Sequence, residues 1–347
     1  MKTLKRILAA TTLLVTLGFA SEANAQVPLE NFFKNPEKAG YQISPDGKYF
    51  SYMAPYENRL NLFVQEVGSD KATRITSETV RDLAGSMWAN GHRILYIKDT
   101  AGDENFQLYG VNVDGTDSKA YTAFPKVRTT IIDPLENIDS LVIIGLNKRN
   151  PQVFDPYRLN LNNGELTQLA ENPGNIQGWM TDHNGKLRVA LAIVDGVNTQ
   201  ILYRETEEQP FRPVLTTNFR ETVSFATFTP DNKMVYALTN IGRDKTALVL
   251  MDPATCEEKE VLYTNDKYDI SGLGYSELKK KLISVSCTGH KGTIRHYFDK
   301  NEEAIRTKLE QKLEGYDINT TSEDKSENIR IIYAGATALM ELIIPIM

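Results

Sequence analysis

A turn followed by an alternating strand recurs about every 46 residues, and this internal repeat constrains the fold more than any other feature of the sequence. The clearest copy has the sequence SPDGK, residues 44–48. Pro45 fixes φ near −65°, Asp46 can hydrogen-bond its own backbone and Gly47 accepts a positive φ, so the segment predicts a tight turn. From Tyr49 onward the side chains alternate with the two-residue period of a half-buried strand.

Five weaker copies of this turn follow, and each leads into an apolar strand. Marked by the residue that best tolerates a left-handed backbone, or its equivalent, the copies are centred on Gly47, Gly91, Asn137, Gly185, Asn232 and about Lys279. The steps between them are 44, 46, 48, 47 and 47 residues. A period in the forties with several short strands per unit is typical of the blade of a β-propeller.

A second hairpin lies within most units. Asp114-Gly115 and Asn163-Gly164, for example, stand between alternating runs and are strong hairpin signals. The sequence therefore predicts an all-β fold: a β-propeller of four-stranded antiparallel blades, six of them readable and the seventh incomplete. The alternative is a large β-sandwich or barrel, which would not show this self-similarity. The predicted blades span residues 41–78, 83–124, 128–170, 176–217, 223–264 and 270–324, with a partial blade at 328–335.

The sixth unit departs from the pattern because it contains a helical segment. Asp299 is a suitable N-cap, and Glu302 stands three residues after it. Apolar residues then recur every four positions at Ile305, Leu309 and Leu313, and Gly315 follows as a stop signal. One helix is therefore predicted as an insertion in blade six, where it could cover a sheet edge.

The two ends of the chain differ from the predicted propeller domain, residues 26–335. Residues 1–25 have a basic start, an apolar run and an Ala23-Asn24-Ala25 cleavage pattern, so we expect a signal peptide and an exported protein, periplasmic or secreted. Its apolar run is too short to span a membrane. Residues 336–347 form an aberrant tail whose short apolar run is interrupted by Glu341 and Pro345, so no stable membrane anchor is predicted.

Charge and cysteine content exclude other classes of protein. The formal net charge is −6, and no cluster of Lys and Arg suggests binding to a phosphate backbone, so no nucleic-acid partner is expected. Cys256 and Cys287 could form one disulfide at most. Because they lie in unlike contexts, a turn and a strand, we expect two unpaired thiols.

A search for catalytic motifs yields one weak match. The serine nucleophile of a hydrolase requires G-x-S-x-G on a strand-turn-helix. The nearest string is GYSEL at residues 274–278, in which Leu278 replaces the second glycine and a strand follows instead of a helix. Ser276 is therefore predicted to lie in a blade turn.

Candidate ligand residues are equally sparse. Cys287, His290 and His296 form the one ligand-like cluster, but a structural zinc site needs four ligands and a catalytic one three plus water. The remaining histidines, His92 and His183, fall in or beside blade turns. The acids Asp46, Asp99 and Asp114 are turn or loop residues without the spacing of a calcium loop, and no nucleotide-binding motif is present. Trp88 and Trp179 could stack on ligands, but aromatic residues on alternating strands usually pack in the core. We therefore predict no catalytic, cofactor-binding or metal residues and no cofactor; the sequence identifies no substrate-binding residue.

Two stretches resemble a known family. The SPDGK turn with its aromatic strand resembles the propeller repeat shared by TolB-like periplasmic proteins and the prolyl-oligopeptidase family. The order His296-Tyr297-Phe298-Asp299-Lys300, helix, Gly315-Tyr316 and Ile332-Tyr333-Ala334-Gly335 resembles the passage from the sixth to the seventh blade in exported bacterial acylaminoacyl-peptidase-like enzymes of that family. Together the resemblance covers about residues 28–335.

The resemblance implies a serine peptidase with a propeller over a C-terminal α/β-hydrolase domain that carries a Ser-Asp-His triad. In such enzymes the propeller admits only peptides or unfolded termini. No residue here matches the catalytic motifs, so we expect the non-catalytic, substrate-gating propeller of an exported peptidase, truncated or frame-shifted near Ala336. Peptide hydrolysis is then expected only of a full-length form.

Two other functions are compatible with the sequence. The first is a stand-alone periplasmic TolB-like propeller that binds a protein partner through its loops. The second is a propeller hydrolase or lyase with its site in the central channel, although no paired carboxylates or metal set can be assembled for it.

Overall fold

The computed structural model describes residues 28–290 and 292–336. The chain divides into two units, Met1–Glu37 and Lys38–Met347. The described part of the first contains one short 3-10 helix, η1 (Leu29–Phe32). All other described elements belong to the second. The predicted signal peptide and, apart from Ala336, the predicted tail lie outside the described residues.

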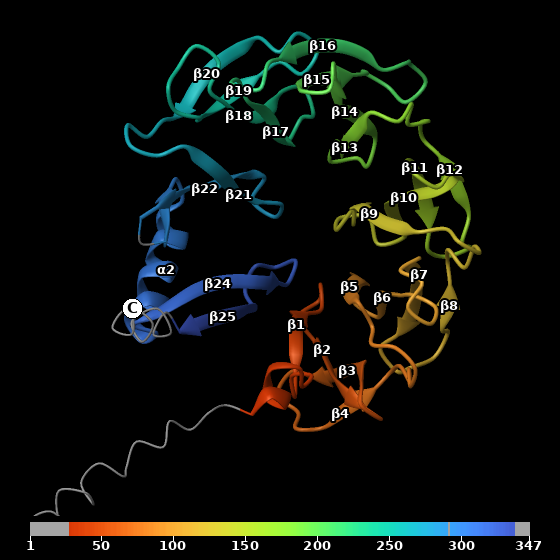
Figure 1. Ribbon diagram of the computed structural model, residues 1–347. Helices are drawn as coiled ribbons and strands as arrows, with labels where there is room; N and C mark the ends of the chain where they lie inside the picture. Colours follow the sequence, from red (N-terminus) through yellow and green to blue (C-terminus); the bar gives the residue numbers. More distant parts are fainter. Residues whose placement is uncertain (1–27, 291, 337–347) are drawn as a thin grey trace, which may run out of the picture. The chain divides into compact units, whose positions relative to one another are not determined.

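Seven antiparallel sheets follow one another in chain order around a central axis within the second unit (Figure 1). The first contains β1 (Ala39–Ile43), β2 (Tyr49–Tyr56), β3 (Arg59–Glu66) and β4 (Ala72–Arg74). The second contains β5 (Gly85–Asn90), β6 (Arg93–Lys98), β7 (Gln107–Asn112) and β8 (Lys119–Ala120). The third contains β9 (Thr129–Asp133), β10 (Leu141–Asn150), β11 (Val153–Asn160) and β12 (Leu166–Gln168).

The fourth and fifth sheets are also four-stranded meanders. The fourth contains β13 (Ile176–Thr181), β14 (Leu187–Val194), β15 (Asn198–Tyr203) and β16 (Arg212–Thr217). The fifth contains β17 (Val223–Phe228), β18 (Val235–Thr239), β19 (Ala247–Met251) and β20 (Glu258–Tyr263). The predicted β-propeller of four-stranded antiparallel blades is confirmed for these five sheets.

The last two sheets differ from the predicted boundaries. The sixth has three strands, β21 (Ile270–Ser276), β22 (Lys281–Gly289) and β23 (Gly292–Tyr297), and the predicted helix α2 (Lys300–Lys312) follows it. Within the described residues the seventh has two, β24 (Tyr316–Glu323) and β25 (Arg330–Ala336). The assignment of residues 316–324 to blade six was wrong, because β24 pairs along its length with β25.

The turn between β24 and β25 is a seventh copy of the repeat, which the sequence analysis missed. Its Glu327 has φ of +57°, 47 residues after Lys280, which has φ of +51° in the preceding copy. The Asp324 backbone N–H donates to the Ile329 carbonyl at 3.0 Å, and the Glu327 N–H donates to the Asp324 carbonyl at 2.9 Å. The turn has neither glycine nor asparagine at its left-handed position, so no sequence signal marks it.

Two well-separated copies of the turn have the same hydrogen bonds, which shows that the repeat is structural. In the first, Ser44 Oγ donates to Asp46 Oδ1 at 2.7 Å, and the Tyr49 N–H donates to Ser44 Oγ at 2.9 Å. In the fifth, Thr229 Oγ1 donates to Asp231 Oδ1 at 2.6 Å. Partial burial alone would raise the pKa of Asp46, but hydrogen bonds from Ser44 and Lys48 lower it on balance.

Other copies adopt a different turn from the one expected. The left-handed residue of the third copy is Leu135, with φ of +51°, and that of the sixth is Lys280; the expected positions were Asn137 and about Lys279. Gly91 has no positive φ, but a Cβ there would lie 2.9 Å from Asp46 Cγ of the preceding blade. A larger residue at this position would have to displace the Asp46 side chain, so the close approach of two blades favours glycine.

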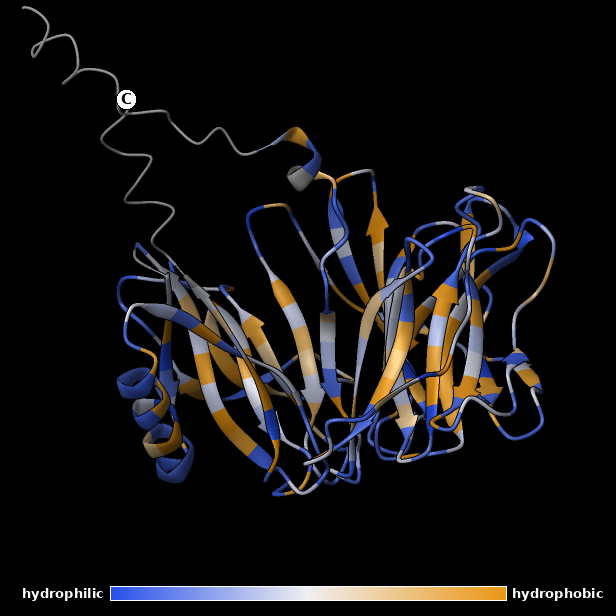
Figure 2. Cartoon of the chain, turned by 90° about the horizontal axis from the view of Figure 1, so that it is seen from below, coloured by the Kyte–Doolittle hydropathy of each residue, from blue (hydrophilic) through white to orange (hydrophobic). Residues whose placement is uncertain are grey.

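The hydrophobic core lies between neighbouring sheets. Leu95 and Leu108 of the second sheet pack with Val142 and Ile144 of the third, and all four are almost completely buried. A similar cluster joins the fourth and fifth sheets. Figure 2 shows the hydrophobic residues concentrated in the strands and the hydrophilic ones in the loops and in α2. Burial of both sheet faces is the main favourable contribution to the stability of such a repeat fold.

Contacts between the first and seventh sheets close the ring. The Ile43 N–H of β1 donates to Ser322 Oγ of β24 at 3.1 Å. The Lys325 N–H donates to the Pro45 carbonyl at 2.9 Å. The two-stranded seventh sheet thus provides enough surface to contact the first blade.

Helix α2 connects the two shortened sheets. Its N-cap Asp299 accepts hydrogen bonds from the backbone of Asn301 and Glu302, and together with Lys281 these lower the pKa of Asp299 to about 2. Glu302 binds Arg330 of β25 through two hydrogen bonds of 2.7 and 3.0 Å, and Lys279 donates to it at 3.0 Å. This carboxylate therefore joins the sixth and seventh sheets.

We expect Glu302→Gln to lower the free energy of unfolding by about 2 kcal/mol. Fully buried pairs lose about 3–5 kcal/mol when one partner is removed, and the partial exposure of Arg330 reduces the loss. Urea unfolding at neutral pH provides the measurement. The control is Glu303→Gln, one residue along the same helix, where an exposed pair with Lys300 predicts a change within about 0.5 kcal/mol. Equal effects of the two substitutions would contradict the connecting role of Glu302.

Candidate functional site

A cavity of about 1050 Å³ lies within the ring and is the candidate site. Its wall consists mainly of first-strand residues and turns from the first, second, third, sixth and seventh sheets; Met87, Trp88, Tyr275, Thr320 and Ser322 are among them. In Figure 1 the turns that follow β9, β21 and β24 point toward the middle of the ring. The copies of the repeat that hold the blades together therefore also form part of the channel wall.

Side chains from these turns meet across the channel. Asn137 Nδ2 of the third blade donates to Glu277 Oε2 of the sixth at 2.9 Å. Lys325 Nζ of the seventh blade donates to Asp139 Oδ1 of the third at 2.7 Å. These partners belong to blades that are not neighbours in the ring, so the contacts bridge the channel.

A third contact across the channel involves His183 of the fourth blade. Its Nδ1 lies 3.4 Å from Glu277 Oε1, and its ring stacks on Tyr275 with 5.6 Å between the centroids. Burial, with the nearby Glu277 carboxylate, raises the pKa of Tyr275 to about 12, so its hydroxyl stays protonated at neutral pH. His183 and Tyr275 thus form a compact stacked pair beside Glu277.

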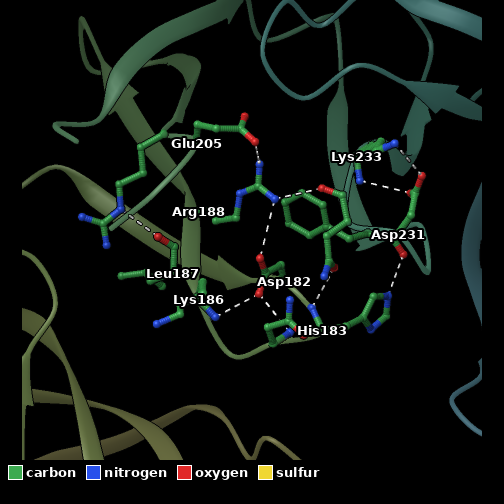
Figure 3. Close-up of polar contacts among 12 residues, drawn as sticks. Asp182, His183, Lys186, Leu187, Arg188, Glu205, Asp231 and Lys233 are labelled. Carbon is green, nitrogen blue, oxygen red and sulfur yellow. Dashed lines mark hydrogen bonds and ion pairs between the residues drawn. The ribbon is translucent and has the colours of Figure 1, made fainter. Parts of the chain in front are cut away.

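Figure 3 shows how the fourth and fifth blades position His183. Its backbone N–H donates to Asn232 Oδ1 at 3.0 Å, and its Nε2 lies 2.9 Å from the Phe228 carbonyl, which can only accept. The buried Arg188 donates to the Asn232 carbonyl at 2.8 Å and pairs with Glu205 at 2.9 Å. Contacts with the neighbouring fifth blade therefore fix the position of the His183 imidazole beside the channel.

The channel wall has more acids than bases. It includes six carboxylates (Glu136, Glu277, Glu302, Glu323, Asp324 and Glu327) and three cations (Lys280, Lys325 and Arg330). Desolvation by surrounding groups raises the pKa of Glu136 although the residue is exposed, and the nearby carboxylates of Glu277 and Asp133 raise it further. Desolvation also raises the pKa of Glu323, whose side chain is 42% exposed, although Arg330 opposes this. The lining therefore favours ligands with a positive group.

Comparisons with known proteins identify the propeller. No family model matches the chain. Dipeptidyl aminopeptidase BIII of Pseudoxanthomonas mexicana is 30% identical over 320 residues, which is 88% of this chain and 45% of that protein. Dipeptidyl peptidase family member 6 of Caenorhabditis elegans is 26% identical over 299 residues, 80% of this chain and 40% of that protein. A solved structure of a prolyl endopeptidase matches with a TM-score of 0.54 and 12% identity, over 76% of this chain and 41% of the other.

The chain is therefore similar to parts of two dipeptidyl peptidases, and it shares the propeller fold of a prolyl endopeptidase. It spans less than half the length of both curated relatives. The prolyl endopeptidase likeness, at 12% identity, supports the fold alone.

Within the propeller, Ser276 is part of a blade turn, as predicted. It ends β21, is 3% exposed, donates to Glu327 and accepts from the Lys279 N–H at 2.8 Å. Its hydroxyl thus connects the turns of the sixth and seventh blades. No histidine appears among its hydrogen-bond partners in the described part of the chain.

The predicted ligand-like cluster is dispersed among aromatic contacts. His296 stacks on Tyr263 at 4.5 Å and His290 packs against the edge of Tyr268 at 6.0 Å. Cys287 is buried, and both it and Cys256 are free thiols, as predicted. Over residues 28–290 and 292–336, no group of three or more His, Cys, Asp or Glu side chains is placed to hold a metal ion.

The other candidate residues have local structural contacts. His92 lies in the β5–β6 turn, where its N–H donates to Asn90 Oδ1. Asp99 pairs with Arg81 at 3.4 Å, and Asp114 accepts hydrogen bonds from Thr116. Trp179 packs against Phe211, and Trp88 packs against the core between the first two blades while also lining the cavity.

The residues that meet in the channel were not predicted as site residues. Asn137 and Glu277 are 140 residues apart in the sequence, and Asp139 and Lys325 are 186 apart. The repeat placed Asn137 and Glu277 in corresponding turns, and this was the one available signal that they could approach each other. No sequence signal indicated the seventh turn, which contains Lys325.

In the described part of the chain no helix is long and apolar enough to span a membrane.

The raised pKa of Glu136 predicts a pH-dependent loss of stability. The folded protein retains this proton above the ordinary pKa of 4.5, so the free energy of unfolding falls as pH rises from that value until the carboxyl is ionised in both states. Glu136→Gln should therefore be more stable than the parent at pH 7 and similar to it at pH 4. Urea unfolding over this range measures the difference. Glu314→Gln, at an exposed acid outside the channel lining, controls for the lost charge; a difference that does not vary with pH would contradict the assignment.

Proposed function

We propose that this chain is the non-catalytic propeller of an exported serine peptidase of the prolyl-oligopeptidase family, and that it limits which peptides reach the catalytic site. The observation that carries the proposal is the 30% identity over 320 residues to dipeptidyl aminopeptidase BIII, a protein of which this chain spans 45%. Peptide hydrolysis would require a hydrolase domain, which we expect only in a longer form of the protein.

The cavity supports this role. Its volume of about 1050 Å³ is slightly above the range of about 300–1,000 Å³ typical of small-molecule sites, which suits a short peptide better than a folded protein. The excess of carboxylates in its wall is complementary to the ammonium group of a peptide N-terminus. The propeller would thereby select substrates by size and charge.

Activity measurements test the first part of the proposal. The purified chain should not react with a fluorophosphonate probe and should not cleave chromogenic aminoacyl substrates, because it contributes no nucleophile. Residues 38–336 should instead support cleavage of short peptides when they replace the matched segment of dipeptidyl aminopeptidase BIII. The matched control is the same chimera with its hydrolase nucleophile changed to alanine. Labelling of any serine in the isolated chain would contradict a non-catalytic role.

A reporter fusion tests export. Residues 1–30 joined to an alkaline phosphatase that is active only outside the cytoplasm should give phosphatase activity in intact bacterial cells, because the apolar run would direct secretion. Replacing both Leu13 and Leu14 by Arg interrupts that run and should abolish the activity. Equal activity of the two fusions, or none from the first, would argue against a signal peptide.

A further inference from the structure

Two of the three cross-channel contacts are made by exposed or half-buried side chains of blades that are not neighbours. Asn137 binds Glu277, and Lys325 binds Asp139. The side chains of Lys325, Asp139 and Glu277 are 41%, 64% and 35% exposed. Contacts between such exposed groups are individually weak and are screened by salt.

The blades do not depend on these contacts for their packing. The Lys325 backbone N–H already binds the Pro45 carbonyl of the first blade, so its turn stays in place without the side chain. His183 is likewise held by Asn232 and Phe228 of the fifth blade. The side chains that cross the channel are therefore additional to the contacts that build the ring.

The residues of these two cross-channel contacts also keep other partners or water when the contacts break. Lys280 Nζ binds Glu277 Oε2 at 2.8 Å within the same turn, so this carboxylate keeps a cation. Asn137, Asp139 and Lys325 are exposed enough to be hydrated. Separation leaves no buried charge without a partner, which would otherwise make opening costly.

We propose that Asn137, Asp139, Glu277 and Lys325 form a reversible clasp across one mouth of the channel. When closed, the clasp restricts entry to the cavity; when open, it admits a solute without separating the blades. The identification of a short peptide as that solute rests on the proposed function, whereas the opening and closing of the clasp does not.

Quenching of Trp88 fluorescence tests the clasp in the chain by itself. The sequence has two tryptophans, so Trp179→Phe leaves Trp88, which lines the cavity, as the sole reporter. In that background, E277A/K325A should raise the Stern–Volmer constant for acrylamide about twofold. The control is Lys48→Ala, which removes a lysine that is 71% exposed and whose ion pair with Asp46 stays within one turn, and it should leave the constant unchanged.

Two further measurements give an answer even if that variant does not fold. Raising the salt concentration from about 50 to about 500 mM should increase quenching in the W179F protein, because screening weakens the Lys325–Asp139 pair. In the same W179F background, the charge-swapped D139K/K325D protein restores an opposite-charge pair and should be quenched like W179F. K325D alone places two carboxylates together and should be quenched more than W179F. A folded E277A/K325A protein, or salt-treated W179F protein, with unchanged quenching would overturn the proposal. Because no peptidase activity is measured, this result is independent of whether the proposed function holds.

Discussion

The contacts between the turns of neighbouring blades determine most of this structure. A single four-stranded sheet with two apolar faces cannot bury them alone, so each blade is stable only against its neighbours. The turns fix the relative positions of the blades. The Asp46 side chain packs against Gly91 so closely that it would have to shift for a larger residue, and Asn232 binds the backbone of His183. The position of each turn in the channel follows from this packing.

In the part of the chain that the structure describes, the sixth and seventh blades meet the same requirement with fewer strands. Three strands and two strands provide less apolar surface than two complete blades, and an ionic cluster replaces part of it. Glu302 of α2 binds Arg330 and Lys279, while Ser276 and Lys279 contact Glu327. Two like-charged glutamates are tolerated together because a lysine lies between them and an arginine binds one of them. The helix therefore contributes through its charged N-terminal turn more than through its apolar stripe.

The local part of this fold could be predicted from the sequence, and the non-local part could not. Glycine, asparagine and proline at fixed offsets identified the turns, and alternation identified the strands, because both depend on neighbouring residues. Residues 316–323 were assigned to the wrong sheet because strand pairing depends on a partner, β25, that the alternation does not specify. The turn containing Glu327 was missed for a related reason. Hydrogen bonds to Asp324 hold its left-handed backbone, so glycine is not needed there. The same limit applies to the site, since contacts such as Lys325–Asp139 join turns that only the closed ring brings together.

The same turns have two functions that require interactions of different strength. Backbone hydrogen bonds and buried contacts hold each turn against the adjacent blade, and loss of one would leave a buried polar group without a partner. Toward the channel, the same turns present exposed carboxylates, amides and lysines, each pair of which contributes only about 0.2–1 kcal/mol. Lys325 shows both roles in one residue, with its backbone bound to Pro45 and its side chain bound to Asp139 across the channel. A ring of this kind can therefore keep its blades in place while the side chains over its channel rearrange.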